Sequence, residues 1–136
     1  MHPSSCRVLL RWSLLPVLLG LAGCSVAERI DITGRVTRNN GSPLVGAKVT
    51  FRSPETGRSA IGYTDANGKY TLGTTTPGEG IPLGGYYVTV EEDRGPVTSM
   101  KPPTVSVKYA SYADSGLKFR LTEGGATTYD MVLDPP

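Results

Sequence analysis

Residues 41–52, GSPLVGAKVTFR, decide the fold that the chain is expected to adopt. The first half of this stretch is a turn signal, because glycine reaches positive φ without steric cost and proline restricts its own φ. In the second half, apolar Ala47, Val49 and Phe51 alternate with polar residues. This alternation is the period of a strand with one buried face, so these three side chains are expected in the core.

Short segments of the same kind, separated by turn signals, continue along the chain. The expected strands cover residues 30–37, 47–52, 59–64, 69–72, 86–91, 117–121 and 127–133. The last two are expected to form a hairpin, residues 73–85 a loop, and residues 105–109 a short strand or an extended arm. No stretch has a helical period. About seven short strands at regular spacing predict an all-β fold, a single Greek-key β-sandwich whose two sheets each hide one face.

The first 23 residues are expected to be a signal peptide that lies outside the fold. Arg7 and Arg11 form a basic start, and the apolar run that follows is uninterrupted for only about ten residues, whereas a membrane-spanning helix needs roughly 20. The end of the segment, Leu21-Ala22-Gly23-Cys24, resembles the bacterial lipobox. In that signal the cysteine sulfur receives lipid, the chain is cut before the cysteine, and the new amino group is acylated. An ordinary signal peptide that happens to contain a cysteine is the alternative.

The lipobox resemblance divides the chain into a signal peptide at residues 1–23, a lipidated tether at 24–29 and a β-sandwich domain at 30–134. Cys24 would then hold the domain at a membrane of the cell envelope, since several acyl chains together give stable attachment. Ser25 rather than Asp follows the cysteine, and by resemblance to the sorting rules of bacteria with two membranes this permits passage to the outer membrane. The domain would face the periplasm or the exterior.

Removal of the signal peptide leaves a chain with little catalytic chemistry. His2 and Cys6 are lost and Cys24 is lipidated, so neither histidine nor a free thiol remains. Serine and cysteine triads and zinc sites are thereby excluded, and we expect no catalytic residue, no metal ligand and no cofactor. The full chain has 14 Lys and Arg against 12 Asp and Glu, and the loss of Arg7 and Arg11 brings the net charge to about zero. A nucleic-acid partner needs a basic patch and is not expected.

Two acidic stretches invite comparison with cation sites. Asp65-Ala66-Asn67-Gly68 resembles the start of a calcium loop, but the twelfth residue counted from Asp65 is Thr76, where such a loop needs Glu. A tight hairpin turn, capped by the Asp65 side chain, is the favoured interpretation. Glu91-Glu92-Asp93 is interpreted as a solvated strand end rather than as a weak cation site.

Four motifs in a fixed order resemble a known family: Gly34-Arg35-Val36, residues 41–51, residues 64–72 and residues 87–90. Their order and spacing are similar to those of the carboxypeptidase regulatory-like, transthyretin-like (prealbumin-like) β-sandwich. The resemblance implies a fold rather than an activity, because such domains accompany enzymes, receptors and surface assemblies as accessory modules. Hydroxyisourate hydrolases of transthyretin-like fold use histidines and a Tyr-Arg-Gly-Ser ending, whereas this chain ends Asp134-Pro135-Pro136. The later part, with Lys108-Tyr109 and Ser115-Gly116-Leu117, is similar to small secreted lipoproteins of planctomycete-type bacteria.

Two functions follow as hypotheses. The first is a non-catalytic envelope lipoprotein, anchored to membrane lipid through acylated Cys24, whose sandwich serves a structural role or binds an envelope protein. The second is a carbohydrate-binding or adhesion module that binds an envelope polysaccharide near loops 73–85 and 92–101. The candidate ligand surface for the second function comprises Tyr86, Tyr87, Tyr109 and Tyr112. Exposed tyrosines on one face would favour the second hypothesis, and buried ones the first.

Overall fold

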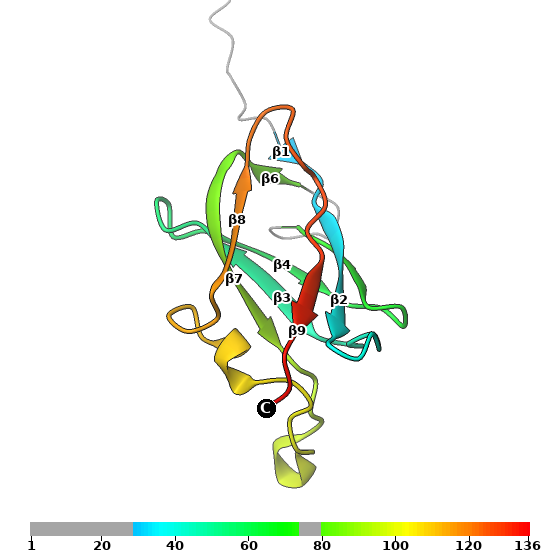
Figure 1. Ribbon diagram of the computed structural model, residues 1–136. Coiled ribbons are helices and arrows are strands. Elements are labelled where there is room, and N and C mark those ends of the chain that lie inside the picture. The colour runs from blue at the N-terminus through cyan, green and yellow to red at the C-terminus, as the bar shows by residue number, and fades with distance from the viewer. Residues whose placement is uncertain (1–28, 74–79) are drawn as a thin grey trace, which may run out of the picture.

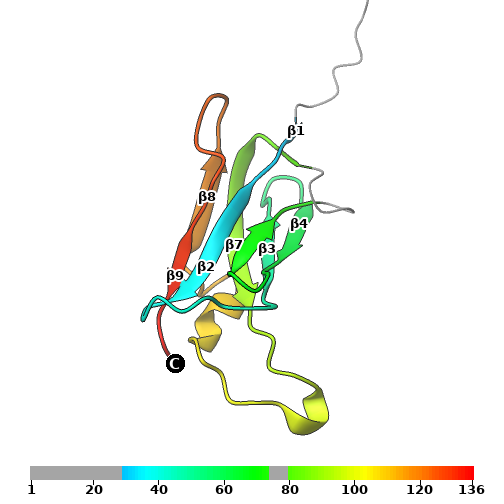
Figure 2. The ribbon, with the colours of Figure 1, turned by 90° about the vertical axis from the view of Figure 1, so that its right-hand side faces the viewer.

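The computed structural model describes residues 29–73 and 80–136, which form strands and two short 3-10 helices (Figures 1 and 2). In chain order the elements are β1 (Arg29–Ile30), β2 (Thr33–Arg38), β3 (Lys48–Arg52), β4 (Ser59–Tyr63), β5 (Lys69–Thr71), β6 (Ile81–Pro82), β7 (Gly84–Glu91), η1 (Val97–Ser99), η2 (Val107–Ala110), β8 (Leu117–Leu121) and β9 (Met131–Leu133). The all-β fold class is confirmed. Within these residues no helix is long and apolar enough to cross a membrane.

Two sheets pack together and form a sandwich. One sheet has three strands in the order β5-β2-β9, and the other has four in the order β4-β3-β7-β8. A two-stranded sheet, β1-β6, lies at one end of the sandwich, at the top of Figure 1. In the described part of the chain the two main sheets therefore contain seven strands, as the turn spacing predicted.

The sheets meet around Phe51, whose side chain is fully buried. Its ring centroid lies 5.6–6.3 Å from those of four other aromatic rings, Tyr70, Tyr86, Phe119 and Tyr129. Such tilted and edge-on packing of aromatic rings adds to the stability gained from burial alone. The remaining fully buried large apolar side chains are Ile32, Leu44, Leu72, Ile81, Leu121, Leu133, Val36, Val49, Val88 and Val90.

The 41–52 stretch turns where the sequence predicts, and it is paired with the residues that follow β4. Gly46 has a φ of 73°, the left-handed conformation that glycine adopts most easily. Directly after it, the Ala47 N–H donates to the Thr64 hydroxyl oxygen at 2.8 Å. The Thr64 N–H returns a bond to the Ala47 carbonyl oxygen at 2.9 Å. The start of β3 is thereby aligned with the end of β4.

The turn at Asp65 is tight and capped by its own side chain, as predicted, but it leads from β4 to β5 in the other sheet and does not close a hairpin. The Asp65 carboxylate accepts the backbone N–H of Lys69 at 3.0 Å and that of Asn67 at 2.8 Å. These two bonds hold the pKa of the Asp65 carboxyl below its ordinary value. Both bonds are to Asp65 Oδ1, so this side chain closes its own turn.

The prediction that residues 117–133 form a hairpin is wrong. β8 pairs antiparallel with β7, whereas β9 pairs parallel with β2, so the two strands belong to different sheets. Just before β9, the Tyr129 N–H donates to the Thr33 carbonyl oxygen at 2.9 Å, which ties this segment to β2. The alternation of apolar residues shows which face of a strand is buried but not which strand lies beside it, and a sandwich often places consecutive strands in opposite sheets.

Two other segments differ from their expected form. Residues 105–109, expected as a short strand or an extended arm, end in the 3-10 helix η2, where the Ser106 hydroxyl accepts the Lys108 N–H at 3.4 Å. The expected loop 73–85 contains β6 and the first residues of β7, and its residues 74–79 lie outside the described part. Short strands of this kind arise from pairing with distant residues, here β1, and carry no pattern of their own.

Candidate functional site

A long loop that projects from one end of the sandwich is the first candidate for a binding site. This arm, residues 92–106, leaves the end of β7, passes through η1 and returns to η2. Figures 1 and 2 place it at the end of the molecule opposite β1. Its tip is exposed, with the Val97 side chain 86% accessible and Met100 48%. Loops presented by a rigid sheet scaffold are common binding elements, so this end of the molecule is a candidate binding surface.

Side-chain hydrogen bonds close the arm at its base. The Glu92 carboxylate accepts the Thr104 N–H at 2.9 Å and also the Thr104 hydroxyl. Further out, Arg94 Nε donates to the Lys101 carbonyl oxygen at 2.7 Å. Arg38 Nε, on β2, donates to Thr104 Oγ1 at 2.9 Å. Both limbs of the arm are therefore bound to each other and to the sandwich.

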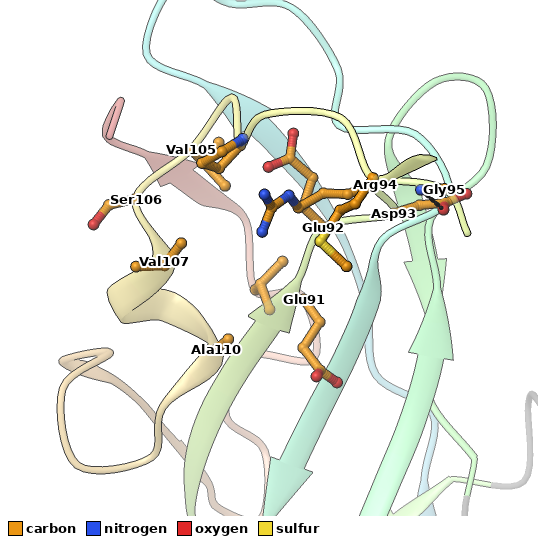
Figure 3. Close-up of a pocket in the computed structure, with 12 residues that line it drawn as sticks. Glu91, Glu92, Asp93, Arg94, Gly95, Val105, Ser106, Val107 and Ala110 are labelled. Atoms are coloured by element: carbon orange, nitrogen blue, oxygen red, sulfur yellow. Dashed lines mark hydrogen bonds between the residues drawn. The ribbon is translucent and has the colours of Figure 1, made fainter. Parts of the chain in front are cut away.

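A pocket of about 310 Å³ lies between the arm, the end of β7 and η2 (Figure 3). Val105 and Val107 lie on one side of it, and Asp93 and Gly95 lie across from them. The Glu91 carboxylate points away from the arm (Figure 3) and lies 3.8 Å from the ammonium of Lys48, its partner on β3. The lining is part apolar and part charged.

If Glu92 is replaced by Ala, the amide hydrogen of Thr104 is expected to exchange at least about tenfold faster. The reason is that a hydrogen bond to a charged acceptor contributes about 1.5–3 kcal/mol to the stability of the closed arm. Each loss of about 1.4 kcal/mol raises the equilibrium constant for opening, and with it the exchange rate, about tenfold. Amide hydrogen exchange of the arm, followed by mass spectrometry, measures the change. Glu91→Ala, which removes the neighbouring carboxylate, is the matched control and should leave the Thr104 amide unchanged. If the Thr104 amide exchanged at the same rate in the Glu92 variant as in the wild type, other contacts would hold the arm.

Two of the four predicted surface tyrosines are buried, which corrects that part of the prediction. Tyr86 is 6% exposed, and its hydroxyl donates to the Pro82 carbonyl oxygen at 2.6 Å. Tyr109 is 4% exposed; its hydroxyl donates to Asp134 Oδ2 at 3.1 Å and accepts the Asp134 N–H at 3.0 Å. Burial raises the pKa of Tyr86 above its ordinary value. Neither ring can offer a stacking face to a ligand.

The other two tyrosines are exposed and lie near each other. Tyr87 on β7 is 39% exposed and Tyr112, in the turn after η2, is 36% exposed. Both line one shallow hollow, together with Arg52 and Pro54. The Arg52 Cζ atom lies 5.3 Å from the Tyr112 ring centroid, and the Lys118 Nζ atom lies 5.7 Å from that of Tyr87. These are cation–π distances.

The sequence did not single out Arg52 and Lys118, because only strand register brings them to Tyr87. Arg52 on β3 and Lys118 on β8 are the two cross-strand partners of Tyr87. All three side chains lie on the face of the four-stranded sheet that points away from the core. Alternation marked both cations as outward-facing, but their neighbours come from distant parts of the chain.

Cys24, the predicted lipidation site, and the predicted signal peptide lie outside the described residues. Residues 29–73 and 80–136 contain no group of three or more His, Cys, Asp or Glu side chains that could hold a metal ion.

Comparison with known proteins yields one family. Searches of curated proteins and of solved structures found no match. A family model does match: residues 31–94, slightly less than half of the chain, are similar to the carboxypeptidase regulatory-like domain. The matched segment runs from β2 to the end of β7 and includes the turn at residues 41–52 and the capped turn at Asp65. By this match, the larger part of the sandwich is similar to a carboxypeptidase regulatory-like domain, which is a non-catalytic domain family.

Proposed function

We propose that the protein is a non-catalytic lipoprotein of the cell envelope, whose sandwich presents the arm and its pocket to another envelope protein. One observation carries the proposal: β1 and the arm lie at opposite ends of the molecule (Figures 1 and 2). Cys24 is only five residues before Arg29, where β1 begins. A chain of that length spans at most about 18 Å. Lipid on Cys24 would therefore keep the β1 end close to the membrane and the arm away from it.

Chemistry and family likeness support the same proposal. The chain after Cys24 has no histidine and no cysteine, which removes the usual nucleophile and base pairs. The matched family is non-catalytic. The pocket beside the arm combines apolar Val105 and Val107 with charged Asp93 and Arg94. Such a lining suits a partner segment with apolar and charged side chains.

Replacement of Cys24 by Ala is expected to abolish lipidation. Intact mass measured on the membrane fraction of cells that express the native chain should show, for the wild type, a chain that begins at Cys24 and carries added acyl mass. The Cys24→Ala chain should lack that mass, because the thiol that receives the lipid is gone. Cys6→Ala is the matched control, since this cysteine lies in the predicted signal peptide and should leave the mature mass unchanged. An unmodified wild-type chain, or one cut elsewhere, would refute the anchor.

The second candidate function is carbohydrate binding, and the exposed pair Tyr87 and Tyr112 favours it. The two rings line one hollow on the outer face of the four-stranded sheet. Exposed tyrosines can pack against the apolar face of a sugar ring while their hydroxyls stay in water. This surface is separate from the arm pocket, so both functions can operate in one molecule.

A further inference from the structure

We infer that the outer face of the four-stranded sheet binds an acidic polysaccharide, a sugar chain whose units carry carboxylates. The inference rests on the second candidate function and names its ligand class. The site is the cationic–aromatic row, defined here as Arg52, Tyr87 and Lys118, with Tyr112 and Arg120 beside it.

Strand register sets the geometry of the cationic–aromatic row. Arg52, Tyr87 and Lys118 are direct partners on β3, β7 and β8, which are neighbours in the sheet. Adjacent strands are about 4.8 Å apart, so the row spans about 10 Å. Arg120 follows two positions after Lys118 on β8 and therefore faces the same side. The row offers one ring with a cation on each side, over a length that matches a short stretch of a sugar chain.

The cations of the row have aromatic neighbours rather than acidic ones. Lys118 lies over the Tyr87 ring and Arg52 over the Tyr112 ring. The ion pairs found in the described part of the chain are Lys48–Glu91 and Lys108–Asp134, and neither includes a cation of the row. Glu55 is the acidic side chain among the residues that line the hollow beside Lys118 and Arg120. Among the described residues these cations have no bonded carboxylate to displace, so they can take one from a ligand.

The shape of the surface favours a sugar chain. Two shallow hollows flank Tyr87, one with Arg52, Pro54 and Tyr112 and the other with Lys118 and Arg120. An exposed ring between two hollows is a platform for the apolar face of a pyranose. Each uronic acid unit carries such a face and a carboxylate together, and an arginine fork binds a carboxylate through two parallel bonds. Nucleic acid would need a larger basic stripe than a domain of about zero net charge supplies.

The test is a binding titration of the full chain in detergent with oligogalacturonate, and with malto-oligosaccharide of the same length as the neutral probe. We expect the acidic probe to bind at least about tenfold more tightly. Tyr87→Ala, and separately the double variant Arg52→Gln/Lys118→Gln, should each weaken oligogalacturonate binding at least about tenfold. Tyr63→Ala, on the same outer face but at 63% exposure and away from the row, and Lys101→Gln, on the arm, are the matched controls and should bind as the wild type. Far-UV circular dichroism checks that each variant is folded.

Three results would overturn the inference. Equal binding of the neutral and the acidic probe would remove the preference for acidic sugars and leave carbohydrate binding in place. Loss of binding in the charge variants with no effect of Tyr87→Ala would show general attraction of an anion rather than a built site. Binding of neither probe would remove the second candidate function together with its ligand, while the proposal of a protein partner at the arm would stand.

Discussion

Replacement of Gly34 by Ala is expected to destabilise the sandwich by at least about 3 kcal/mol, at the upper end of the cost of overpacking. A methyl group at this position would lie 1.9 Å from the Tyr129 carbonyl oxygen and 2.7 Å from the Tyr70 hydroxyl oxygen. These two atoms are bonded to each other, since the Tyr70 hydroxyl donates to the Tyr129 oxygen at 2.5 Å. Because the first obstacle is backbone, no side-chain rotation can relieve it. Either β2 must move away from the residues before β9, or that hydrogen bond must break.

Urea unfolding of the variant, followed by far-UV circular dichroism, measures this loss. Native domains are stable by only about 5–15 kcal/mol, so the variant should unfold at a clearly lower urea concentration. Gly57→Ala is the matched control: its φ of 73° is unfavourable for alanine, but no atom lies within 4 Å of the added methyl group. The Gly57→Ala substitution should lower the free energy of unfolding by about 1–2 kcal/mol, the strain of the left-handed conformation alone. A Gly34 variant as stable as the control would mean that β2 and the residues before β9 are not packed as described.

Replacement of Phe51 by Ala is expected to cost about 3–5 kcal/mol, the range for removing a large aromatic side chain from a core. The side chain has no solvent exposure, and its ring touches aromatic rings from both sheets. Loss of the ring would leave a cavity at the point where the sheets meet. Thermal unfolding should show a fall in Tm of at least about 10 °C, since each kcal/mol shifts the Tm of a small domain by roughly 4–8 °C.

Tyr63→Ala is the control for the Phe51 variant, because it removes an aromatic ring of the same sheet from its exposed side. Substitutions on an exposed surface usually change stability by no more than about 0.5 kcal/mol. If both variants unfolded at the same temperature, Phe51 would not lie at the centre of the core. The Tm of the Phe51→Leu variant should lie between those of Phe51→Ala and the wild type, since leucine keeps most of the buried apolar volume.

Several features of the site were within reach of sequence reasoning. Alternation through residues 86–91 places Tyr86 with Val88 and Val90, and the structure buries all three. The same alternation leaves Tyr87 on the outer face, where it is exposed. The predicted ligand surface included both tyrosines, although neighbouring residues of a strand point to opposite faces of the sheet and cannot share one surface. The burial of Tyr109 had no such signal, because it depends on η2 packing against the end of the sandwich.

Local chemistry, by itself, determined where the chain turns and which side of each strand is apolar. Gly46, Asp65 and Gly68 act within a few residues of their own position, and the alternation of Ala47, Val49 and Phe51 is visible along one strand. The tertiary structure alone decided which strands are neighbours. It placed β8 beside β7 and β9 beside β2, brought Arg52 and Lys118 to Tyr87, and left no room for a side chain at Gly34 by bringing Tyr129 against it. The physical reason is that turns and alternation follow from short-range sterics and from burial of one face, whereas pairing partners depend on contacts between residues far apart in the chain.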